Sequence, residues 1–215
     1  MMSLCFSGCS ITWGDELRNR YQERYSTLVS KHYDYRHFNL SECGISNDSI
    51  VRSTINNITH TKPDIVVIQY TVHPRIEYFA ENDTIENWTP QSLNKFSKSR
   101  NYYVTHYNEL VGNENMWKNI FLFDSFCKSI NQKYVSFIAD HFERVIVKPE
   151  KYYNNKIGYW RKMCKDYNPV FLQKDLLGTS EQYPEHYAQG KRGGHPSAEG
   201  HKKIANKIIE LIDAI

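Results

Sequence analysis

Short apolar runs alternate along the chain with segments whose hydrophobic residues recur at helical spacing. Residues 4–6 are apolar and end at a Ser-Gly turn, and Leu17, Tyr21, Tyr25 and Leu28 then recur every three or four positions. Apolar runs closed by a turn are typical of buried strands, and a recurrence near 3.6 residues is typical of a helix that packs on one face. The first thirty residues therefore predict a strand, a tight turn and a helix.

The same order repeats along the rest of the chain. Residues 35–40 predict a second strand, and the apolar positions of residues 50–58 predict a helix. The run Ile-Val-Val-Ile at 65–68 has no polar alternation, which a strand buried on both faces requires. The remaining predicted elements are helical segments within 92–112 and 115–132, a strand at 134–139, a strand near 169–172 inside an irregular excursion at about 142–192, and a helix over 197–215.

Alternating strands and helices predict the architecture of the whole chain. Such alternation favours a parallel sheet with helices on both faces and right-handed crossovers. We therefore expect a three-layer α/β/α sandwich, flavodoxin-like, with a central parallel sheet of about five strands. The 215 residues suffice for one domain with its own core, so residues 1–215 are expected to form a single domain.

Composition narrows the class of protein. Hydrophobic residues make up 40% of the chain and charged residues 24%, with a net charge of +3, which excludes a disordered or fibrous chain. This small excess of positive charge predicts no nucleic-acid partner. No stretch of 18 apolar residues and no basic leader is found, so we expect no membrane contact and a cytoplasmic or virus-associated protein. The oligomeric state stays open.

Two residue types add to this picture. The five cysteines form no Cys-x-x-Cys pair, which favours free thiols in a reducing compartment. The 16 tyrosines are numerous, and tyrosine offers both a flat apolar face and a hydroxyl to polar ligands such as sugars. Packing in the core and on the surface is the favoured explanation for most of them.

Reactive side chains are expected where the strands of a parallel sheet end. Ligands bind beyond the carboxyl ends of such strands. Ser10 follows the first predicted strand, Gly44 the second, the segment 71–75 the third and Asp140 the fourth, while His195 precedes the last helix. The sequence therefore predicts that these residues meet at one edge of the sheet.

Ser10 and His195 have the chemistry of a nucleophile and a base. A serine hydroxyl becomes nucleophilic when a neighbouring base accepts its proton, and a strand-to-helix turn exposes the hydroxyl beside backbone N–H groups. An imidazole can accept that proton and later return it to the leaving group. Taken singly, Ser10 could be a helix cap, His195 a surface turn residue, and His201 a packing residue in the last helix.

Three blocks of the sequence resemble the SGNH (GDSL-like) hydrolase family over nearly the whole chain. Phe6-Ser7-Gly8-Cys9-Ser10 resembles the first block, Gly44 the glycine of the second, and His195-Pro196-Ser197-Ala198-Glu199-Gly200-His201 the histidine end of the last. The resemblance implies a serine hydrolase in which Ser10 is the nucleophile and His195 the base. It also implies an oxyanion hole built from Ser10, Gly44 and a third donor.

Three positions depart from the family pattern. Cys9 replaces the aspartate of the first block, and Arg192 stands where the last block has its acid. His73 occupies the place of the family's asparagine in the oxyanion hole, with Asn47 and Thr71 as alternative donors.

The departure at Arg192 leaves the partner of the His195 imidazole open. An imidazole usually needs a partner on its second nitrogen to fix its tautomer. Asp140, Glu185 or a backbone carbonyl in 191–194 could fill this role. Arg75 could hold an anionic or sugar substrate, or could form an ion pair with Glu77 or Asp83.

These observations predict a carboxylic ester hydrolase, and by family analogy an esterase that removes O-acetyl groups from a carbohydrate. Two alternatives remain: an acyltransferase that uses a sugar acceptor, and a disabled carbohydrate-binding or structural domain. No cofactor or metal is expected. The glycines of 190–194 lack the spacing of a phosphate-binding loop, and His186, His195 and His201 lack the spacing of a zinc site.

Overall fold

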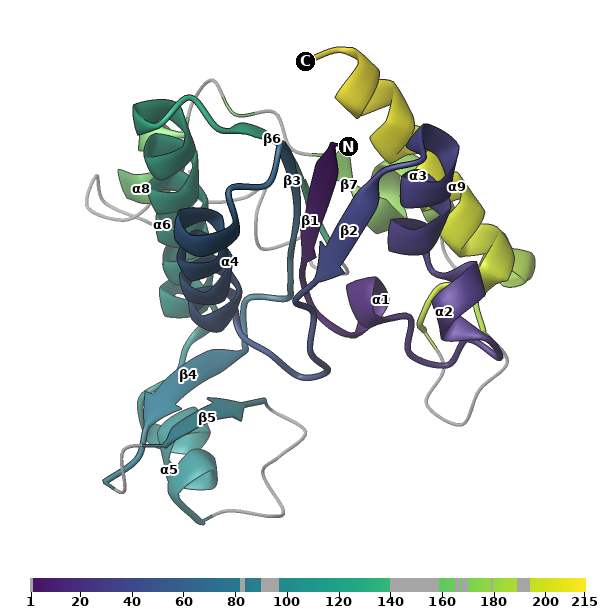
Figure 1. Ribbon diagram of the computed structural model, residues 1–215. Helices are drawn as coiled ribbons and strands as arrows, with labels where there is room; N and C mark the ends of the chain where they lie inside the picture. Colours follow the sequence, from purple (N-terminus) through teal and green to yellow (C-terminus); the bar gives the residue numbers. More distant parts are fainter. Residues whose placement is uncertain are drawn as a thin grey trace.

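A computed structural model gives the fold, with a parallel sheet at its centre (Figure 1). It describes residues 2–81, 84–89, 97–139, 159–164, 167, 170–178, 180–188 and 194–215. The strands of the sheet are β1 (Ser3–Ser7), β2 (Arg36–Asn39), β3 (Ile65–Tyr70), β6 (Lys133–Ile138) and β7 (Val170–Phe171). They lie in the order β2-β1-β3-β6-β7, and every neighbouring pair is parallel.

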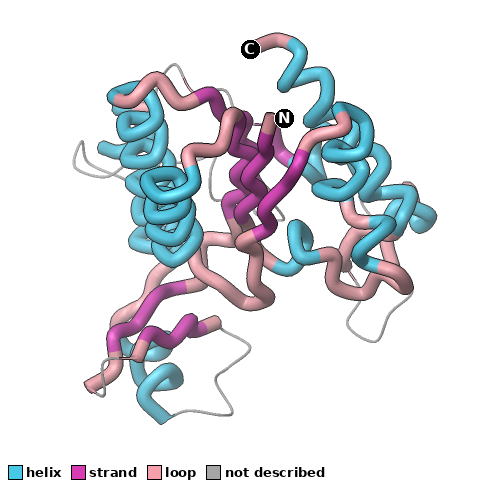
Figure 2. Tube along the Cα trace, viewed as in Figure 1, coloured by secondary structure: helices cyan, strands magenta, loops and turns pink. Residues whose placement is uncertain are grey.

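Helices cover both faces of the sheet (Figure 2). On one side lie α3 (Tyr25–Tyr33) and α9 (Ala198–Asp213), and on the other α4 (Asn47–Thr61), α6 (Glu109–Ser129) and α8 (Tyr159–Met163). Successive side chains of β1 point to opposite faces of the sheet: Leu4 and Phe6 pack with α3 and α9, whereas Cys5 packs with α4 and α6. The predicted three-layer sandwich is confirmed. Among the described residues, no helix is both long and apolar enough to cross a bilayer.

The structure corrects the predicted helices in two places. The single helix expected between residues 17 and 28 is broken at Arg24, whose backbone is extended, into α2 (Arg20–Glu23) and α3. The segment 92–112 holds α5 (Ser97–Thr105) and the start of α6, which Asn108 caps by accepting the N–H of Val111. The strand expected near 169–172 is confirmed as β7; the other described elements within 142–192 are α8, a π-helical turn at Leu172–Leu177 and a 3-10 turn at Pro184–His186.

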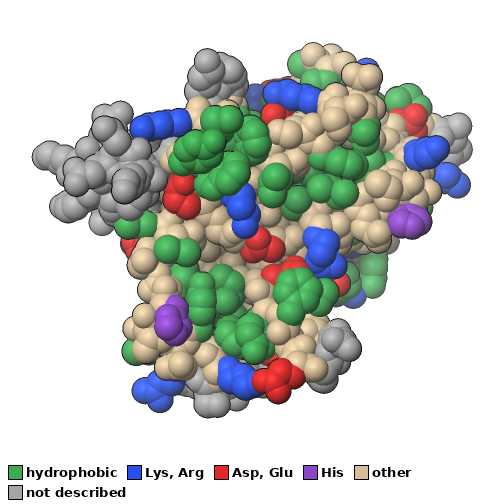
Figure 3. All heavy atoms as spheres, turned by 90° about the vertical axis from the view of Figure 1, so that its left-hand side faces the viewer, with side chains coloured by type: hydrophobic (Ala, Val, Ile, Leu, Met, Phe, Trp, Pro, Cys, Tyr) green, Lys and Arg blue, Asp and Glu red, His purple; other side chains and the backbone are tan. Residues whose placement is uncertain are grey.

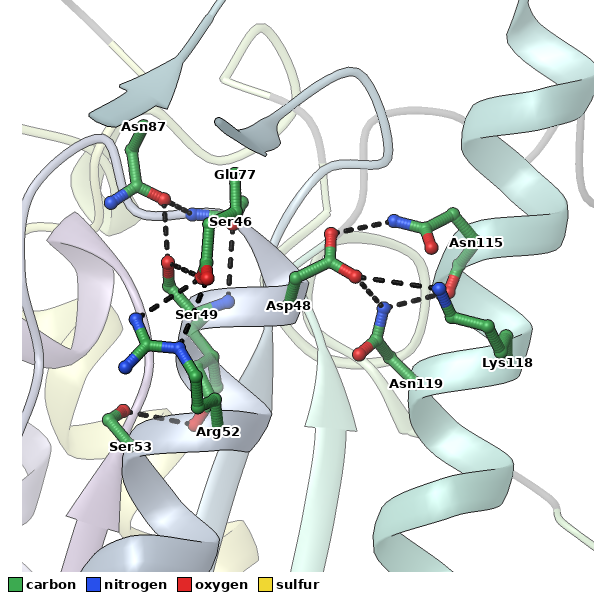
Figure 4. A network of polar contacts seen from close by, with 11 residues as sticks. Ser46, Asp48, Ser49, Arg52, Ser53, Glu77, Asn87, Asn115, Lys118 and Asn119 are labelled. Carbon is green, nitrogen blue, oxygen red and sulfur yellow. Dashed lines mark hydrogen bonds and ion pairs between the residues drawn. The ribbon is translucent and has the colours of Figure 1, made fainter. Parts of the chain in front are cut away.

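A two-stranded hairpin is the element that the sequence pattern did not predict. Strands β4 (Ile76–Phe79) and β5 (Ile85–Trp88) pair antiparallel and, with α5, form a lobe below the carboxyl ends of the main strands (Figure 1). The Glu77 carboxylate accepts hydrogen bonds from the Ser49 hydroxyl and from Arg52, 3.1 Å away at Nε (Figure 4). These contacts tie the lobe to α4.

A buried histidine links α9 to α3 and makes the stability of the fold depend on pH. His201 is fully buried and stacks on Tyr25, and its Nδ1 accepts the backbone N–H of Tyr25 at 3.1 Å. Burial, with a smaller contribution from His195, lowers the pKa of His201 from 6.5 to about 3. Between these values the unfolded chain binds a proton that the folded chain does not, so stability is lost as the pH falls below 6.5.

We predict that His201→Leu flattens this dependence. The free energy of unfolding of the wild type should fall by up to about 1.4 kcal/mol per pH unit from this histidine alone, and the variant should lack that part of the slope. Urea unfolding between pH 7 and pH 4 measures it, with the exposed His32→Leu as control. An unchanged slope in His201→Leu would contradict the assignment.

Candidate active site

Ser10 opens the one-turn helix α1 (Ser10–Trp13) directly after β1 and lies beside His195. The side-chain Oγ of Ser10 is 2.8 Å from Nε2 of His195, although 185 positions separate the two residues. Ser10 is only 5% exposed. The structure thus brings together the two residues that the sequence selected as nucleophile and base.

Backbone contacts hold His195 in this place before α9. Its carbonyl accepts the N–H of Ala188 at 2.9 Å, and Pro196 forms an antiparallel bridge with Tyr187. Ser197 then caps α9, with its Oγ accepting the N–H of Gly200 at 3.2 Å. The imidazole therefore projects from a short, doubly anchored segment toward the end of β1.

Glu16 is the partner of the second ring nitrogen of His195. Its Oε2 lies 3.0 Å from Nδ1, and its side chain is only 9% exposed. Glu185 does not take this position, since its carboxylate lies 3.7 Å from His186 instead. Asp140, the other candidate, lies outside the described residues. Asp15 approaches the imidazole from the Nε2 side, at 3.9 Å.

The turn after α1 brings Glu16 back toward Ser10. Gly14 ends the helix with a left-handed backbone (φ 84°), which glycine adopts without steric cost, and Asp15 donates its N–H to the Ser10 carbonyl at 2.9 Å. Glu16 itself has φ 66°, a conformation that costs a non-glycine residue about 1 kcal/mol. The sequence signal for Glu16 is an acidic pair, Asp15 and Glu16, just after the first turn of helix, whereas the acids expected from the sequence were Asp140 and Glu185.

A buried network of hydrogen bonds from β3 and α3 holds the Ser10 turn in place. Gln69 on β3 is fully buried, and its Oε1 accepts the Thr12 hydroxyl at 2.7 Å and the Cys9 N–H at 3.4 Å. Its Nε2 donates to the Cys9 sulfur at 3.1 Å, and Thr12 is bonded in turn to the Tyr25 hydroxyl at 2.6 Å. Both ends of α1 are thereby tied to the neighbouring strand and helix.

Cys9 lies in surroundings that favour its anion. Burial raises the pKa of its thiol, but the Arg75 charge and hydrogen bonds from Thr71, Ile11 and Gln69 together bring the pKa below its usual value. Nη1 of Arg75 donates to the Ile45 carbonyl at 3.5 Å. It does not pair with Glu77, which binds Arg52, and Asp83 lies outside the described residues.

The expected oxyanion donors lie on three neighbouring loops. Gly44 has a left-handed backbone (φ 80°), and its loop is joined to the Ser10 turn by the Glu42 N–H, which donates to the Gly8 carbonyl at 3.2 Å. Asn47 exchanges two hydrogen bonds with the Thr71 backbone, at 2.8 and 3.0 Å, and so joins α4 to the end of β3.

His73, the third expected donor, is buried with its ring against Gly112 of α6. Burial lowers the pKa of His73 from 6.5 to about 4, so the imidazole is neutral near pH 7. A neutral imidazole keeps one N–H to donate. In the part of the chain that the structure describes, no three His, Cys, Asp or Glu side chains are grouped as metal ligands.

Comparisons with known proteins identify the fold. No family model and no curated protein matches the sequence. Solved structures match over almost the whole chain. An esterase from a Pseudoalteromonas species, inhibited by monoethylphosphonate, is 12% identical with a TM-score of 0.58, covering 100% of this chain and 98% of its own. A member of the lipolytic protein G-D-S-L family from Veillonella parvula is 12% identical with a TM-score of 0.57, covering 100% of both.

An acetyl xylan esterase is also similar, with 16% identity and a TM-score of 0.55 over 98% of this chain and 100% of its own. At such low identities the likeness shows the fold alone. The chain therefore has the three-layer SGNH hydrolase fold of the G-D-S-L lipolytic proteins, as the sequence resemblance implied.

Proposed function

We propose that this chain, which has the fold of the G-D-S-L lipolytic proteins, is a serine esterase that cleaves carboxylic esters. The observation that carries the proposal is the line of contacts from Ser10 Oγ to His195 Nε2, at 2.8 Å, and from His195 Nδ1 to Glu16, at 3.0 Å. This is the connectivity of a nucleophile, a base and an orienting acid. The esterases among the similar structures support the same reaction.

In the proposed reaction each step is carried by one of these groups. Nε2 of His195 accepts the Ser10 proton as Oγ attacks the ester carbonyl carbon. The negative charge that develops on the carbonyl oxygen is received by backbone N–H groups of Ser10 and Gly44, with His73 as a third donor. The imidazolium then gives its proton to the departing alcohol oxygen, which leaves an acyl group on Ser10.

Water completes the cycle by the reverse set of transfers. His195 takes a proton from water, whose oxygen attacks the acyl carbon, and then returns that proton to Ser10 Oγ as the carboxylic acid leaves. Throughout, Glu16 accepts the N–H of Nδ1, so that Nε2 keeps its lone pair facing Ser10, and it stabilises the imidazolium once formed. The role of Glu16 replaces that of the acid absent at Arg192.

We further propose that the acyl group is acetyl and that the alcohol is a carbohydrate. The acetyl xylan esterase among the similar structures supports this choice. So do the aromatic side chains of the hairpin lobe, since aromatic faces pack on the apolar faces of sugar rings.

The test is hydrolysis of three esters by the intact chain. We expect acetate release from acetylated xylo-oligosaccharides and from p-nitrophenyl acetate. We expect kcat/KM to be at least about 100-fold lower for p-nitrophenyl palmitate, because an enzyme discriminates between two acyl groups by how strongly it binds their transition states. A preference for palmitate would contradict the acetyl assignment. Inactivity toward all three esters, in a folded protein, would contradict the esterase. Xylose in the assay, with products followed by mass spectrometry, detects acyl transfer instead.

A further inference from the structure

A cavity lies at the hairpin lobe. It measures about 630 Å³ and is lined by residues of β4, β5, α5 and the N-terminal turns of α4 and α6. We call it the hairpin cavity. Neither Ser10, Glu16 nor His195 lines it. Its volume lies within the range of small-molecule sites in proteins. Figure 3 shows hydrophobic side chains gathered on this lobe, with basic and acidic side chains among and above them.

Aromatic rings form the apolar part of the hairpin cavity. Trp88 is 4% exposed and is covered by Tyr78, whose ring stacks on it with centroids 4.1 Å apart and planes at 17°. Tyr102 of α5 meets Trp88 edge-on, at 6.3 Å. Phe79, in contrast, is 67% exposed. A rigid aromatic group of this kind, with one ring open to solvent, is a surface on which the apolar faces of pyranose rings can pack.

Polar side chains among these rings can bind hydroxyl groups. Asp48 points between α4 and α6, where it accepts hydrogen bonds from Asn115 at 2.7 Å and Asn119 at 3.1 Å, and its charge is compensated by Lys118 at 3.6 Å (Figure 4). Asn101 lines the cavity from α5 and is exposed. A carboxylate and amides offer both acceptors and donors, as neighbouring sugar hydroxyls require.

The charges in the hairpin cavity favour a neutral ligand. Its two carboxylates, Asp48 and Glu77, already have cationic partners in Lys118 and Arg52. Lys98, at the rim, lies 3.6 Å from Glu81. Because the described lining charges are matched within the protein, binding an ion there would leave a charge without compensation. A polyhydroxylated, uncharged molecule meets no such penalty.

Two residues of its lining connect the hairpin cavity to the segment after β3, which carries the third expected oxyanion donor. Ile76, which lines it, directly follows Arg75, whose charge acts on Cys9. Gly112, also in its lining, packs so closely on His73 that a Cβ there would lie 3.0 Å from the imidazole. We propose that the hairpin cavity is a carbohydrate subsite that binds sugar residues of the chain whose ester is cleaved at Ser10. This inference rests on the proposed esterase function and names where its sugar is held.

Direct binding tests the subsite without any catalysis. Isothermal titration of the intact protein with unacetylated xylotetraose should show binding at ligand concentrations up to about 10 mM. Phe79→Ala should weaken it about fivefold. Val111 also lines the cavity, and Val111→Trp, whose much larger side chain takes up the space that a sugar residue would occupy, should abolish binding. Tyr159→Ala, which removes another exposed aromatic ring, on α8, is the matched control and should change nothing.

Kinetics then connect the subsite to the reaction. Val111→Trp should raise KM for acetylated xylotetraose about tenfold and leave kcat/KM for p-nitrophenyl acetate unchanged, because the small ester does not reach the cavity. Absence of xylotetraose binding in an enzyme that cleaves p-nitrophenyl acetate overturns the subsite and leaves the esterase. Binding that survives Val111→Trp also overturns it. Binding lost in Val111→Trp, in a protein inactive on every ester, supports the subsite and overturns the esterase.

Discussion

Replacing Ser10 by alanine is expected to lower kcat/KM for p-nitrophenyl acetate by about 10⁵-fold or more, to the level of the uncatalysed background. Among the described residues, the Ser10 hydroxyl is the one hydrogen-bonded to Nε2 of His195, at 2.8 Å, so that His195 can accept its proton. Without this hydroxyl no acyl-enzyme can form on residue 10. Because Ser10 is small and sits at the start of a short helix, the variant should keep its fold, which circular dichroism and urea unfolding can verify.

The neighbouring thiol requires a matched control. The Cys9 sulfur lies 3.8 Å from Ser10 Oγ, and a thiolate can itself cleave an activated ester. If Ser10 is the nucleophile, Cys9→Ala should retain most of the activity that Ser10→Ala loses. Mass spectrometry after treatment with a fluorophosphonate should place the label on Ser10 in the wild type and find none in Ser10→Ala. Full activity of Ser10→Ala together with inactivity of Cys9→Ala would show that the Cys9 sulfur, and not Ser10 Oγ, is the nucleophile.

Replacing Glu16 by glutamine is expected to lower kcat by about 10⁴-fold, the second-largest effect. A carboxylate can only accept a hydrogen bond from Nδ1, whereas an amide can also donate one, which would place the imidazole proton on Nε2, where it faces Ser10. Because binding of the substrate does not depend on this proton, KM should change little. Steady-state kinetics with p-nitrophenyl acetate separates the two parameters.

Two further variants separate this role of Glu16 from a structural one. Glu185→Gln, which alters one of the two acids expected from the sequence, should leave kcat unchanged because that carboxylate lies beside His186. Glu16→Gly should lose activity as Glu16→Gln does, yet gain about 1 kcal/mol of stability, since glycine removes the cost of the left-handed backbone (φ 66°). Normal activity in Glu16→Gln would show that another group orients His195.

The sequence pattern predicted the strands of the main sheet but not those of the hairpin lobe. Strands β1 and β3 are fully buried between the two layers of helices, so their mostly apolar runs locate them in the sequence. The edge strands β2 and β7 are only partly buried. The hairpin has strands of four residues with mixed burial, and its Glu77 carboxylate is bound by Ser49 and Arg52 on α4. Such partners are distant in sequence, so periodicity within the hairpin carries little signal.

The sequence by itself determined the layered fold, the place of reactive groups at the ends of the strands, and the choice of Ser10 and His195. Local rules decide these features: hydrophobic periodicity, turn chemistry and short motifs each depend on neighbouring residues. Only the tertiary structure decided that Glu16 faces His195 and that aromatic rings of the hairpin and α5 enclose a cavity. These depend on backbone turns at Gly14 and Glu16 and on packing between distant segments, where a contact follows from the path of the whole chain rather than from spacing along it.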